Sequence, residues 1–333
     1  MPAEPLLTVT RAGLYVPDGD FHIDPTRIVP RAVITHGHAD HARAGHGAVL
    51  ATAETLAIME ARMGPRFAAS RQALRYGERA ALGGVSLRLL SAGHVLGSAQ
   101  AVIEKGGVRA IVTGDFKRRA DPAAAPFELV EADHLVTEAT FGLPVFRHPP
   151  AEGEVAKLLQ SLRLFPARPH LVGAYSLGKA QRLILLLRAA GYDLPIYCHD
   201  AVLKIVDVYR RFGYDFGSLR SLAGATPEAF AGAVAIGPPE RLAPALDGRT
   251  APPVTVFASG WLGLRARARR SNVMLPLVIS DHADWDELTR TIDEVAPARL
   301  WVMHGAEAAL VHHARLRGIE AGPLPPAIDA AVP

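Results

Sequence analysis

The sequence predicts an α/β protein in which short strands and helices form layers around one site. In the first 140 residues, several apolar runs of strand length end in a histidine, an aspartate or a glutamate. From residue 141 to about 255, strand-like and helix-like runs alternate with short connections, which is typical of a small parallel-sheet domain. Layered α/β enzymes build their sites from strands that deliver polar residues to one edge of a sheet.

The composition is that of a soluble globular protein with a sizeable core. The chain has 333 residues, of which 49% are hydrophobic and 21% charged. The net charge of +3 is small, so a polyanionic partner would have to meet a local basic patch. With Cys198 as the one cysteine, no internal disulfide framework is expected. The first ten residues lack a signal-peptide pattern, and no apolar run reaches membrane-spanning length. We therefore expect a cytoplasmic protein without membrane contact.

The densest functional signal follows a short buried strand expected at residues 32–34. His36, His38, Asp40 and His41 fall within six residues directly after that strand. Residues two apart in an extended segment share a side, so His36 and His38 can face one ion. Imidazole and carboxylate groups are the usual ligands of zinc and similar ions, and Asp40 and His41 can reach a second ion. The alternative is a solvated histidine-rich loop or an adventitious metal site.

Two more residues are candidates for the same metal site. Asp24 ends a strand upstream of the cluster, where it either orients a ligating imidazole or only caps the turn before a proline. His94 comes soon after a strand predicted at residues 85–91 and has glycines on both sides. A lone histidine is more often structural, but the repeated placement after a strand favours a ligand.

Two carboxylates repeat the pattern. Asp115 follows a strand predicted at residues 108–113 and is suited to bridge two metal ions. Glu138 lies at the tip of a strand predicted at residues 135–140.

Other elements are predicted between and after these strand ends. A helix is expected at residues 53–63 with Thr52 as its N-cap, and a further strand at residues 74–79. The second part of the chain is predicted as a strand at 170–174, a helix at 178–190, a strand at 194–199, a helix at 201–212 and, after a loop-rich stretch, a strand at 254–258.

Two features of the second part suggest binding of phosphate groups. The turn that contains Ser176 and Lys179 opens a helix after a strand, where free backbone N–H groups and the lysine can hold a phosphate. Such turns are also common without a ligand. Arg265, Arg267 and Arg269 lie within a short basic run, which is usually a solvated face but can neutralise a nucleic-acid backbone.

The chain closes with two more histidines at strand ends. A strand predicted at residues 275–280 is followed by His282, and a strand predicted at residues 300–303 is followed by His304. We expect these residues to return to the site formed by the first part of the chain.

These residues resemble the metal-binding series of the metallo-β-lactamase fold. In chain order the series is His36, His38, Asp40, His41, His94 and Asp115. Glu138 before an insertion, and His282 and His304 after it, resemble the β-CASP branch of nucleases. That branch includes the pre-mRNA 3′-end endonuclease, ribonucleases of the J type and DNA repair nucleases related to Artemis. The segments 21–25, 176–181 and 280–285 are most similar to the bacterial DNA ligase-associated exonucleases, whose genes accompany an ATP-dependent DNA ligase and a helicase.

The resemblance covers nearly the whole chain and implies its organisation. Residues 1–143 and 256–333 would form an αββα metallo-β-lactamase sandwich, and residues 144–255 an inserted α/β β-CASP domain.

The resemblance also implies two divalent metal ions, with zinc expected and manganese as the alternative. One ion would be held by His36, His38 and His94. The other would be held by Asp40, His41 and His304, with Asp115 bridging the two. Glu138 and His282 would form a carboxylate–imidazole pair in which His282 is a candidate general acid, and Asp24 would match the first acidic motif of the family.

Phosphodiester hydrolysis suits such a site because two cations can activate water and stabilise the anionic transition state. The favoured function is a DNA exonuclease in DNA repair, acting on single-stranded DNA or a free end beside an ATP-dependent ligase and helicase. An RNA-processing nuclease is the alternative, favoured by His304, because eukaryotic DNA-acting members carry an apolar residue there. Outside nucleases, the alternatives are a small-molecule metallo-hydrolase or a non-catalytic binding module.

Overall fold

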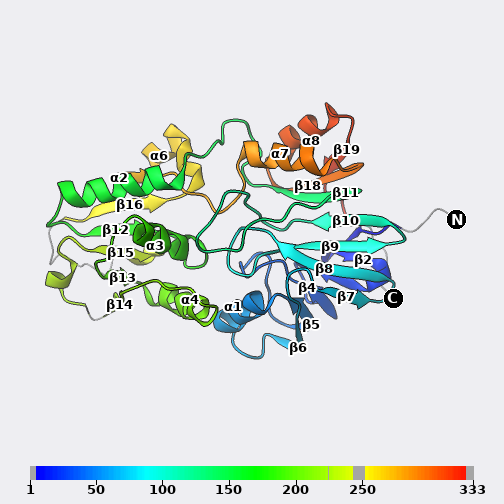
Figure 1. The fold of residues 1–333 in the computed structure, drawn as a ribbon, viewed down its shortest axis with the longest axis horizontal. Coiled ribbons are helices and arrows are strands. Elements are labelled where there is room, and N and C mark those ends of the chain that lie inside the picture. Colours follow the sequence, from blue (N-terminus) through cyan, green and yellow to red (C-terminus); the bar gives the residue numbers. More distant parts are fainter. Residues whose placement is uncertain (1–4, 224, 243–251, 328–333) are drawn as a thin grey trace. The chain divides into compact units, whose positions relative to one another are not determined.

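The computed structural model describes residues 5–223, 225–242 and 252–327, and the chain divides into two compact units (Figure 1). Unit 1 consists of Met1–Pro144 and His282–Pro333, and unit 2 is the inserted segment Val145–Asp281. Both units combine sheets with helices, so the prediction of a mixed α/β fold is confirmed.

The first sheet of unit 1 has six strands in sequence order. It begins with antiparallel pairs and continues with parallel ones from the third strand onward. Its strands are β1 (Thr8–Thr10), β2 (Gly13–Val16), β3 (Phe21–Ile23), β4 (Arg31–Val33), β5 (His46–Ala51) and β6 (Ala68–Ala73). A short 3-10 helix, η1 (Pro17–Gly19), connects β2 and β3.

The second sheet of unit 1 has seven strands in the order β19-β18-β11-β10-β9-β8-β7. The strands from β7 to β10 pair antiparallel, and those from β10 to β19 pair parallel. Its strands are β7 (Arg79–Leu82), β8 (Val85–Ser91), β9 (Ala99–Lys105), β10 (Val108–Val112), β11 (His134–Ala139), β18 (Arg299–Gly305) and β19 (Glu320–Pro323). The strands β11 and β18 are neighbours although unit 2 separates them in the chain.

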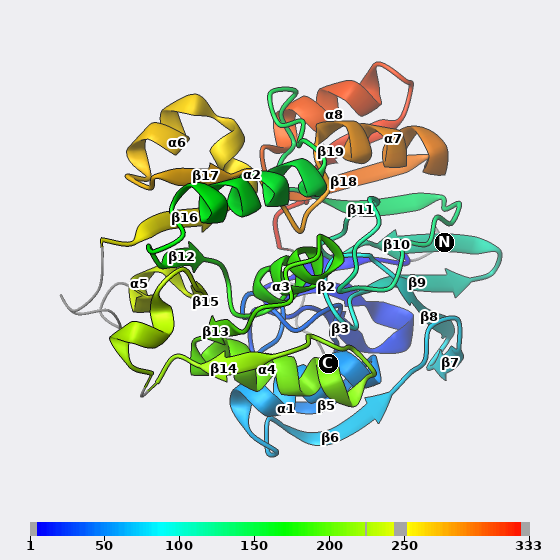
Figure 2. The same cartoon turned by 60° about the vertical axis from the view of Figure 1, so that its left-hand side comes forward.

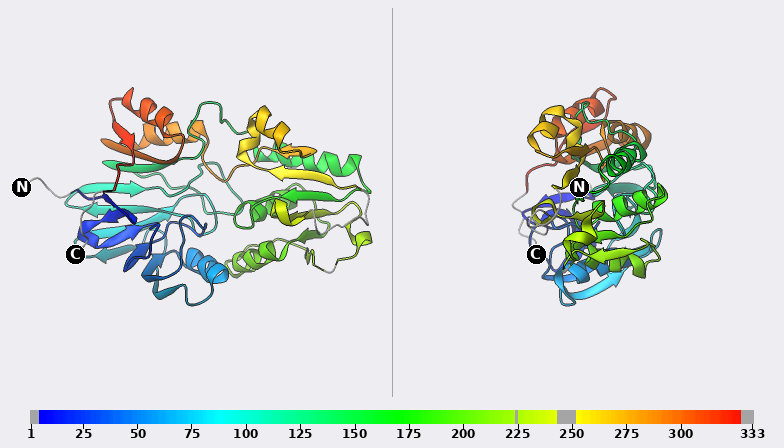
Figure 3. Two further views of the ribbon diagram at one scale, coloured as in Figure 1. Left: turned by 180° about the vertical axis from the view of Figure 1, so that it is seen from behind. Right: turned by 90° about the vertical axis from the view of Figure 1, so that its left-hand side faces the viewer.

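The two sheets of unit 1 share a hydrophobic core, and helices cover their other faces. Val33 of the first sheet and Leu87 of the second both belong to the shared core. Because successive strand residues alternate in direction, the neighbouring Ala32 faces the other way, where it clusters with Met59 of α1 (Ala53–Met63). In Figure 3, α1 lies beside the first sheet. The second sheet packs through its other face on α7 (Trp285–Val295) and α8 (Glu307–Arg315), which lie beside β18 in Figure 2.

One prediction in this part of the chain is confirmed to the residue and another is wrong. The helix α1 begins after Thr52, whose hydroxyl accepts the Thr55 N–H at 3.1 Å, a cap that contributes about 1 kcal/mol. No strand spans residues 74–79. The strand β6 ends at Ala73, and the chain turns at Gly77, which has a φ of +77°. This positive φ interrupts the extended conformation before β7 begins.

Unit 2 is built on a third sheet, in which every pair of strands is parallel. The order is β14-β13-β15-β12-β16-β17. Its strands are β12 (His170–Gly173), β13 (Ile196–Cys198), β14 (Leu219–Ser221), β15 (Val234–Gly237), β16 (Val254–Ala258) and β17 (Leu275–Leu277). Its helices are α2 (Ala151–Leu164), α3 (Lys179–Ala189), α4 (Asp200–Arg211), α5 (Pro239–Leu242) and α6 (Arg265–Arg270), with 3-10 turns η2 (Pro227–Phe230) and η4 (Gly260–Gly263).

The structure of unit 2 contains elements that were not predicted, and its boundary differs from the expected one. The helix α2 and the strand β15 were not predicted. The helix α2 follows Pro150, which offers no capping side chain, and β15 lies in the stretch expected to be loop. We expected the insertion to end at residue 255, but residues 256–281 cluster with unit 2 because β16 and β17 add to its sheet.

No helix within the described ranges 5–223, 225–242 and 252–327 is long and apolar enough to cross a membrane.

Candidate metal centre

Three strand ends of unit 1 supply the first group of candidate ligands. The strands β8 and β10 are both antiparallel to β9, so they end at the same edge of the second sheet. His94 and Asp115 follow these two strands, and His36 follows β4 of the first sheet.

Close backbone packing brings the Asp115 loop next to the His36 segment. Gly114 has a φ of +56°, and a Cβ atom there would lie 2.6 Å from Thr35 Oγ1. A side chain at this position would therefore push Asp115 away from His36. The glycine is required both by its conformation and by this contact.

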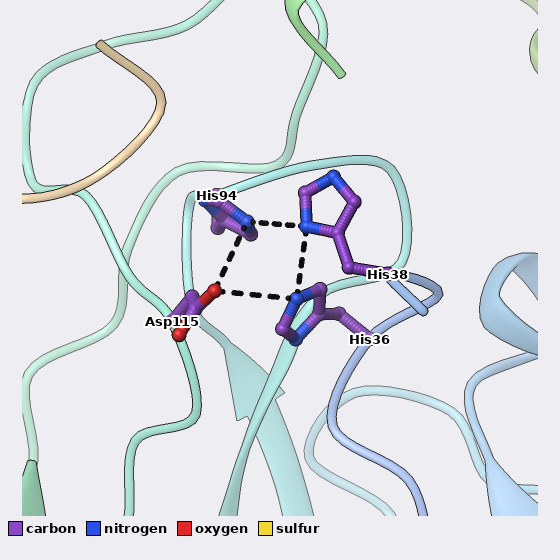
Figure 4. A group of neighbouring side chains, drawn as sticks. All are labelled: His36, His38, His94 and Asp115. Carbon is purple, nitrogen blue, oxygen red and sulfur yellow. Dashed lines mark hydrogen bonds and ion pairs between the residues drawn. The ribbon is translucent and has the colours of Figure 1, made fainter. Parts of the chain in front are cut away.

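Four side chains converge on one point in Figure 4: His36, His38, His94 and Asp115. Nδ1 of His38 lies 3.0 Å from Nε2 of His36 and 3.1 Å from Nε2 of His94. Oδ2 of Asp115 lies 3.5 Å from Nε2 of His36 and 3.7 Å from Nε2 of His94. Each residue has one ligand atom in a group whose atoms all lie within 4.8 Å of one another.

These separations suit a metal ion better than a set of hydrogen bonds. Zinc binds imidazole nitrogen at about 2.0–2.1 Å, which puts neighbouring ligand atoms about 3–3.4 Å apart. Two imidazole nitrogens can share only one proton, yet three ring nitrogens meet here. The donor set therefore fits a divalent cation.

Asp115 also belongs to a second group, with His41 and His304. Oδ1 of Asp115 lies 3.4 Å from Nε2 of His41, whereas its other oxygen faces the first group. This is the arrangement expected of a bridging carboxylate. The rings of His41 and His304 are 5.3 Å apart between centroids.

Asp24 orients His41. Nδ1 of His41 donates to Oδ2 of Asp24 at 2.7 Å, and the Asp24 carboxylate also accepts from the N–H and the hydroxyl of Thr35. The bond fixes the tautomer, so Nε2 of His41 is the ring nitrogen that faces Asp115. This nitrogen is buried and has no hydrogen-bond partner within the part of the chain that the structure describes. A buried nitrogen without a partner is costly in a protein but is expected of a metal ligand.

The charges around the centre agree with this assignment. Burial and the adjacent His41 lower the pKa of His36 well below its ordinary value, which favours the neutral imidazole that binds metals. Burial raises the pKa of Asp115, but the nearby His282 and His41 lower it by more. The pKa of Asp115 therefore lies well below the ordinary range, and the group is a carboxylate.

The pKa of His41 reflects the carboxylates beside it. Burial lowers the pKa of His41, but Asp115 and Asp24 outweigh that effect, so its pKa lies well above the ordinary value. The buried carboxylate of Asp115 and the half-buried carboxylate of Asp24 thus favour a positive charge on the His41 ring. A proton or a metal ion can provide it, and metal binding displaces the proton.

His304 reaches the second group through a β-bulge. In the pairing of β11 with β18, Met303 is opposite Glu138 and Gly305 is opposite Ala139, so His304 is the extra residue. Its φ is +57°, a conformation that is rare for residues other than glycine. Bulges re-aim side chains next to functional sites, and this one leaves His304 exposed.

Glu138 and His282 form the pair that the sequence suggested. Nδ1 of His282 lies 3.0 Å from Oε2 and 3.1 Å from Oε1 of Glu138. Glu138 is 1% exposed and also accepts the N–H of Phe116 at 2.8 Å. Together with Asp115, these two residues form another group that could hold a metal ion, so His282 has two possible roles.

Asp40 departs from the expected arrangement. It belongs to none of the ligand groups found among the described residues. Its side chain is 76% exposed, and its Oδ2 lies 3.8 Å from Nε2 of His41. Asp40 follows the turn that already presents His36 and His38, which places its carboxylate at the solvent side of the centre.

The predicted phosphate turn of unit 2 is wrong in its main premise. The N–H groups of Gly178, Lys179 and Ala180 are all bonded within the turn, to Gln181, Leu177 and Tyr175 respectively. The carbonyl of Ser176 likewise accepts from the Gln181 side chain. A helix start whose N–H groups are satisfied internally has no free donors for a phosphate.

Lys179 is buried in an ion pair instead. It is 5% exposed, and its Nζ lies 3.1 Å from Oδ2 of Asp281. Arg182, one turn further along α3, lies 3.6 Å from Oδ1 of Asp281 and donates to the carbonyl of Ser280. All of these residues belong to unit 2.

The basic run is confirmed as an exposed surface of α6. Arg265, Arg267 and Arg269 are exposed. The guanidinium of Arg267 lies 4.2 Å from the ring centroid of Trp261, a cation–π contact that restricts its motion.

Sequence reasoning missed two residues that hold the site together. Thr35 binds both Asp24 and Nδ1 of His36. Arg62 of α1 donates to the carbonyl of Gly37, within the histidine segment. Thr35 could have been found from its position before His36, whereas nothing in the sequence marks Arg62.

The comparisons with known proteins point to nucleases and to a ligase. No protein-family model matches the chain. It is 32% identical to a probable DNA ligase of Opitutus terrae, over 93% of this chain and 30% of that protein. It is 32% identical to cleavage and polyadenylation specificity factor subunit 3 of Dictyostelium discoideum, over 42% of this chain and 19% of that protein. The endoribonuclease YSH1 of Mycosarcoma maydis is 28% identical, over 55% of this chain and 26% of that protein. The chain thus spans about a third or less of the length of these relatives.

A solved structure shares the fold. The crystal structure of a protein of unknown function from Enterococcus faecalis V583 matches with a TM-score of 0.62, over 89% of this chain and 79% of that one, at 15% identity.

The fold and the converging imidazole and carboxylate groups define an α/β protein of the metal-binding class. The sequence similarities confirm the more particular resemblance expected from the motifs: the chain is a relative of the β-CASP nucleases of the metallo-β-lactamase fold.

Proposed function

We propose that the protein is a two-metal phosphodiesterase that acts as a DNA exonuclease in DNA repair. The observation that carries the proposal is Asp115, whose two oxygens face two different sets of imidazoles. In this reading unit 1 is the αββα metallo-β-lactamase domain and unit 2 the inserted β-CASP domain.

The residues that would hold the metals follow from the two groups. His36, His38 and His94 would bind one ion, His41 and His304 the other, and Asp115 both. When bound, two such ions activate water, polarise the phosphoryl oxygen and stabilise the charge of the transition state. The His and Asp ligands suit zinc, and manganese accepts the same donor types.

His282 would be the general acid for the leaving oxygen. Its Nδ1 is engaged by Glu138, so Nε2 is the nitrogen that gives up the proton. The side chain is 23% exposed, which allows contact with a substrate. An imidazole held by a carboxylate is a suitable acid near neutral pH.

The choice of DNA rests on a relative that matches 93% of this chain and is named as a probable DNA ligase. The name supports DNA as the substrate and a DNA ligase as a partner. A free DNA end as substrate, and an ATP-dependent ligase with a helicase as partners, belong to the proposal that the sequence motifs suggest. The exposed arginines of α6, Arg265, Arg267 and Arg269, would contact the phosphate backbone. We retain no role for Lys179 in substrate binding, since Asp281 already pairs with it.

RNA is the second candidate substrate. The relatives named as an endoribonuclease and as a cleavage and polyadenylation factor support it, as does the histidine at position 304.

The test supplies zinc or manganese to metal-free protein and compares 5′-labelled and 3′-labelled single-stranded DNA with RNA of the same sequence. We expect metal-dependent loss of nucleotides from one end of the DNA and at least tenfold slower action on RNA. The reverse preference would favour RNA processing. Hydrolysis of a lactone or thioester, with no action on either polymer, would overturn the nuclease proposal.

A further inference from the structure

A cavity in unit 1 extends from the second ligand group into the space between the two sheets. Its volume is about 160 Å³, and His41, His304 and Glu138 form part of its wall. The metal-binding role explains these residues but not the cavity behind them.

The body of the cavity is apolar, and both sheets contribute to it. Leu14 and Ile23 come from the first sheet, and Val112, Val136 and Met303 from the second. Leu324, just after β19, completes the lining. The apolar walls therefore come from two facing sheets, and a flat ring can lie between them.

The rim of the cavity is polar. Thr26, Asp40 and His304 line it and are exposed. Asp24 and Thr137 add polar groups further in. The cavity is therefore open to solvent beside the metal-binding residues and carries hydrogen-bonding groups around its mouth.

Its size matches one aromatic ring. An apolar cavity of about 150 Å³ in another protein accepts benzene. A ring with an apolar face and polar edges, such as a pyrimidine, would place its faces against the apolar walls and its edges near the rim.

We propose that this cavity binds the nucleobase of a nucleotide whose phosphate lies at the second ligand group, which consists of His41, Asp115 and His304. The inference rests on the proposed nuclease function and deepens it, because it assigns a subsite for one base. An apolar acyl chain of a small-molecule substrate fits the observations less well, since the rim offers polar groups that such a chain cannot use.

The first experiment compares two esters with the same leaving group. Thymidine 5′-(p-nitrophenyl phosphate) carries a base, whereas methyl p-nitrophenyl phosphate has none on the retained side. Leu324→Trp fills part of the apolar body and Thr26→Trp narrows the mouth, and neither changes a candidate ligand. Leu316→Trp is the matched control, because Leu316 is 72% exposed and lies outside the cavity lining.

We expect the metal-loaded wild type to prefer the thymidine ester by at least tenfold in kcat/KM. Leu324→Trp should reduce that preference at least fivefold while its rate on the methyl ester stays within twofold, and Leu316→Trp should change neither. Thr26→Trp gives the same readout should Leu324→Trp fail to fold. A preference that is unchanged in both Leu324→Trp and Thr26→Trp would overturn the proposal.

A binding measurement separates this proposal from the proposed function. Thymidine 5′-monophosphate and deoxyribose 5-phosphate are titrated calorimetrically into metal-loaded protein. At least tenfold tighter binding of the nucleotide, lost in Leu324→Trp, would support the cavity even where neither ester is hydrolysed. Equal affinity for the two ligands would overturn it even where DNA is degraded.

Discussion

Polar residues gather at strand ends in unit 1 and around the start of α3 in unit 2, but they meet different partners. In unit 1, His36, His38 and His94 present ring nitrogens to one another and to a single carboxylate (Figure 4). In unit 2, Lys179 and Arg182 flank the carboxylate of Asp281. The first set consists of groups that all accept a cation, whereas the second contains opposite charges that satisfy each other.

The difference shows that a cluster of polar residues is not by itself a functional site. A metal site needs ligand atoms that gather around one point and leave a positive charge to be supplied by an ion. In unit 1 three ring nitrogens and a carboxylate oxygen gather in this way. In unit 2 the two cations already pair with Asp281. Five variants test this difference between the two units.

The largest effect is expected for Asp115→Ala. The substitution removes a carboxylate shared by three ligand groups, so metal binding should fall from two ions to less than one per chain. The associated loss of transition-state stabilisation, several kcal/mol, should lower kcat at least about 10³-fold. Elemental analysis and a nuclease assay would measure both. Asp133→Ala, at an exposed position before β11, is the control, and a fully metallated Asp115→Ala protein would contradict the assignment.

His282→Asn should lower kcat by about 10²- to 10⁴-fold, the usual contribution of a general acid. Metal content should stay at the wild-type value, because Glu138 rather than a metal engages Nδ1 of His282. The exposed His312 provides the control variant His312→Asn. Loss of one metal equivalent would instead make His282 a ligand, as its group with Asp115 and Glu138 permits.

Lys179→Met tests how much the buried ion pair of unit 2 contributes to stability. Removing the lysine leaves a buried carboxylate with one fewer cation, which should destabilise unit 2 by about 3–5 kcal/mol. Arg210→Met breaks an exposed pair with Asp207 in the same unit and should cost under about 1 kcal/mol. Urea unfolding followed by circular dichroism would compare them. Equal stabilities, with weaker DNA binding for Lys179→Met, would restore the phosphate-binding interpretation.

Asp24→Asn should weaken binding of the second metal by about 10- to 100-fold, because it removes the carboxylate that orients His41. Asparagine tolerates the positive φ of this position, +45°. Asp20→Asn is a close control, since Asp20 has a φ of +48° and lies away from the ligands. Competition with a chromogenic chelator would give the affinities. Identical values would reduce Asp24 to a turn residue.

The smallest effect is expected for the double variant Arg267→Ala/Arg269→Ala. Loss of two phosphate contacts should reduce the salt slope of single-stranded DNA binding by about 1.4, and the affinity at physiological salt only modestly. Fluorescence anisotropy over a range of salt concentrations would measure the slope. Arg210→Ala/Arg211→Ala removes two exposed charges from α4 as a control. An unchanged slope in the α6 variant would mean that these arginines are only solvated.

The sequence predicted best where local chemistry decides the structure. The cap at Thr52 set the start of α1, and the crowding of His36, His38 and His41 after one strand marked a metal centre. The helix α2 was missed because Pro150 gives no capping signal. The strand β15 is short and follows a glycine turn, which resembles a loop in sequence.

Features that depend on distant partners could not be predicted. The sequence shows Lys179 near a glycine, as in phosphate-binding turns, but the carboxylate that neutralises it lies far along the chain. The bulge at His304 depends on the register between β11 and β18, and the cavity depends on the separation of two sheets. Each is a property of tertiary packing, for which one segment carries no local signal.

The pairing of β11 with β18 also affects the entropy cost of inserting unit 2 into the chain. The chain leaves unit 1 shortly after β11 and returns at His282, whose side chain is bonded to Glu138 of β11. Unit 1 therefore holds the two ends of the inserted segment close together, and unit 2 forms the loop between them. The entropy cost of closing such a loop rises by only about 0.6 kcal/mol for each doubling of the loop length. Every candidate ligand lies in unit 1. An insertion of this kind can change in length at little entropic cost while the candidate ligand groups of unit 1 stay in place.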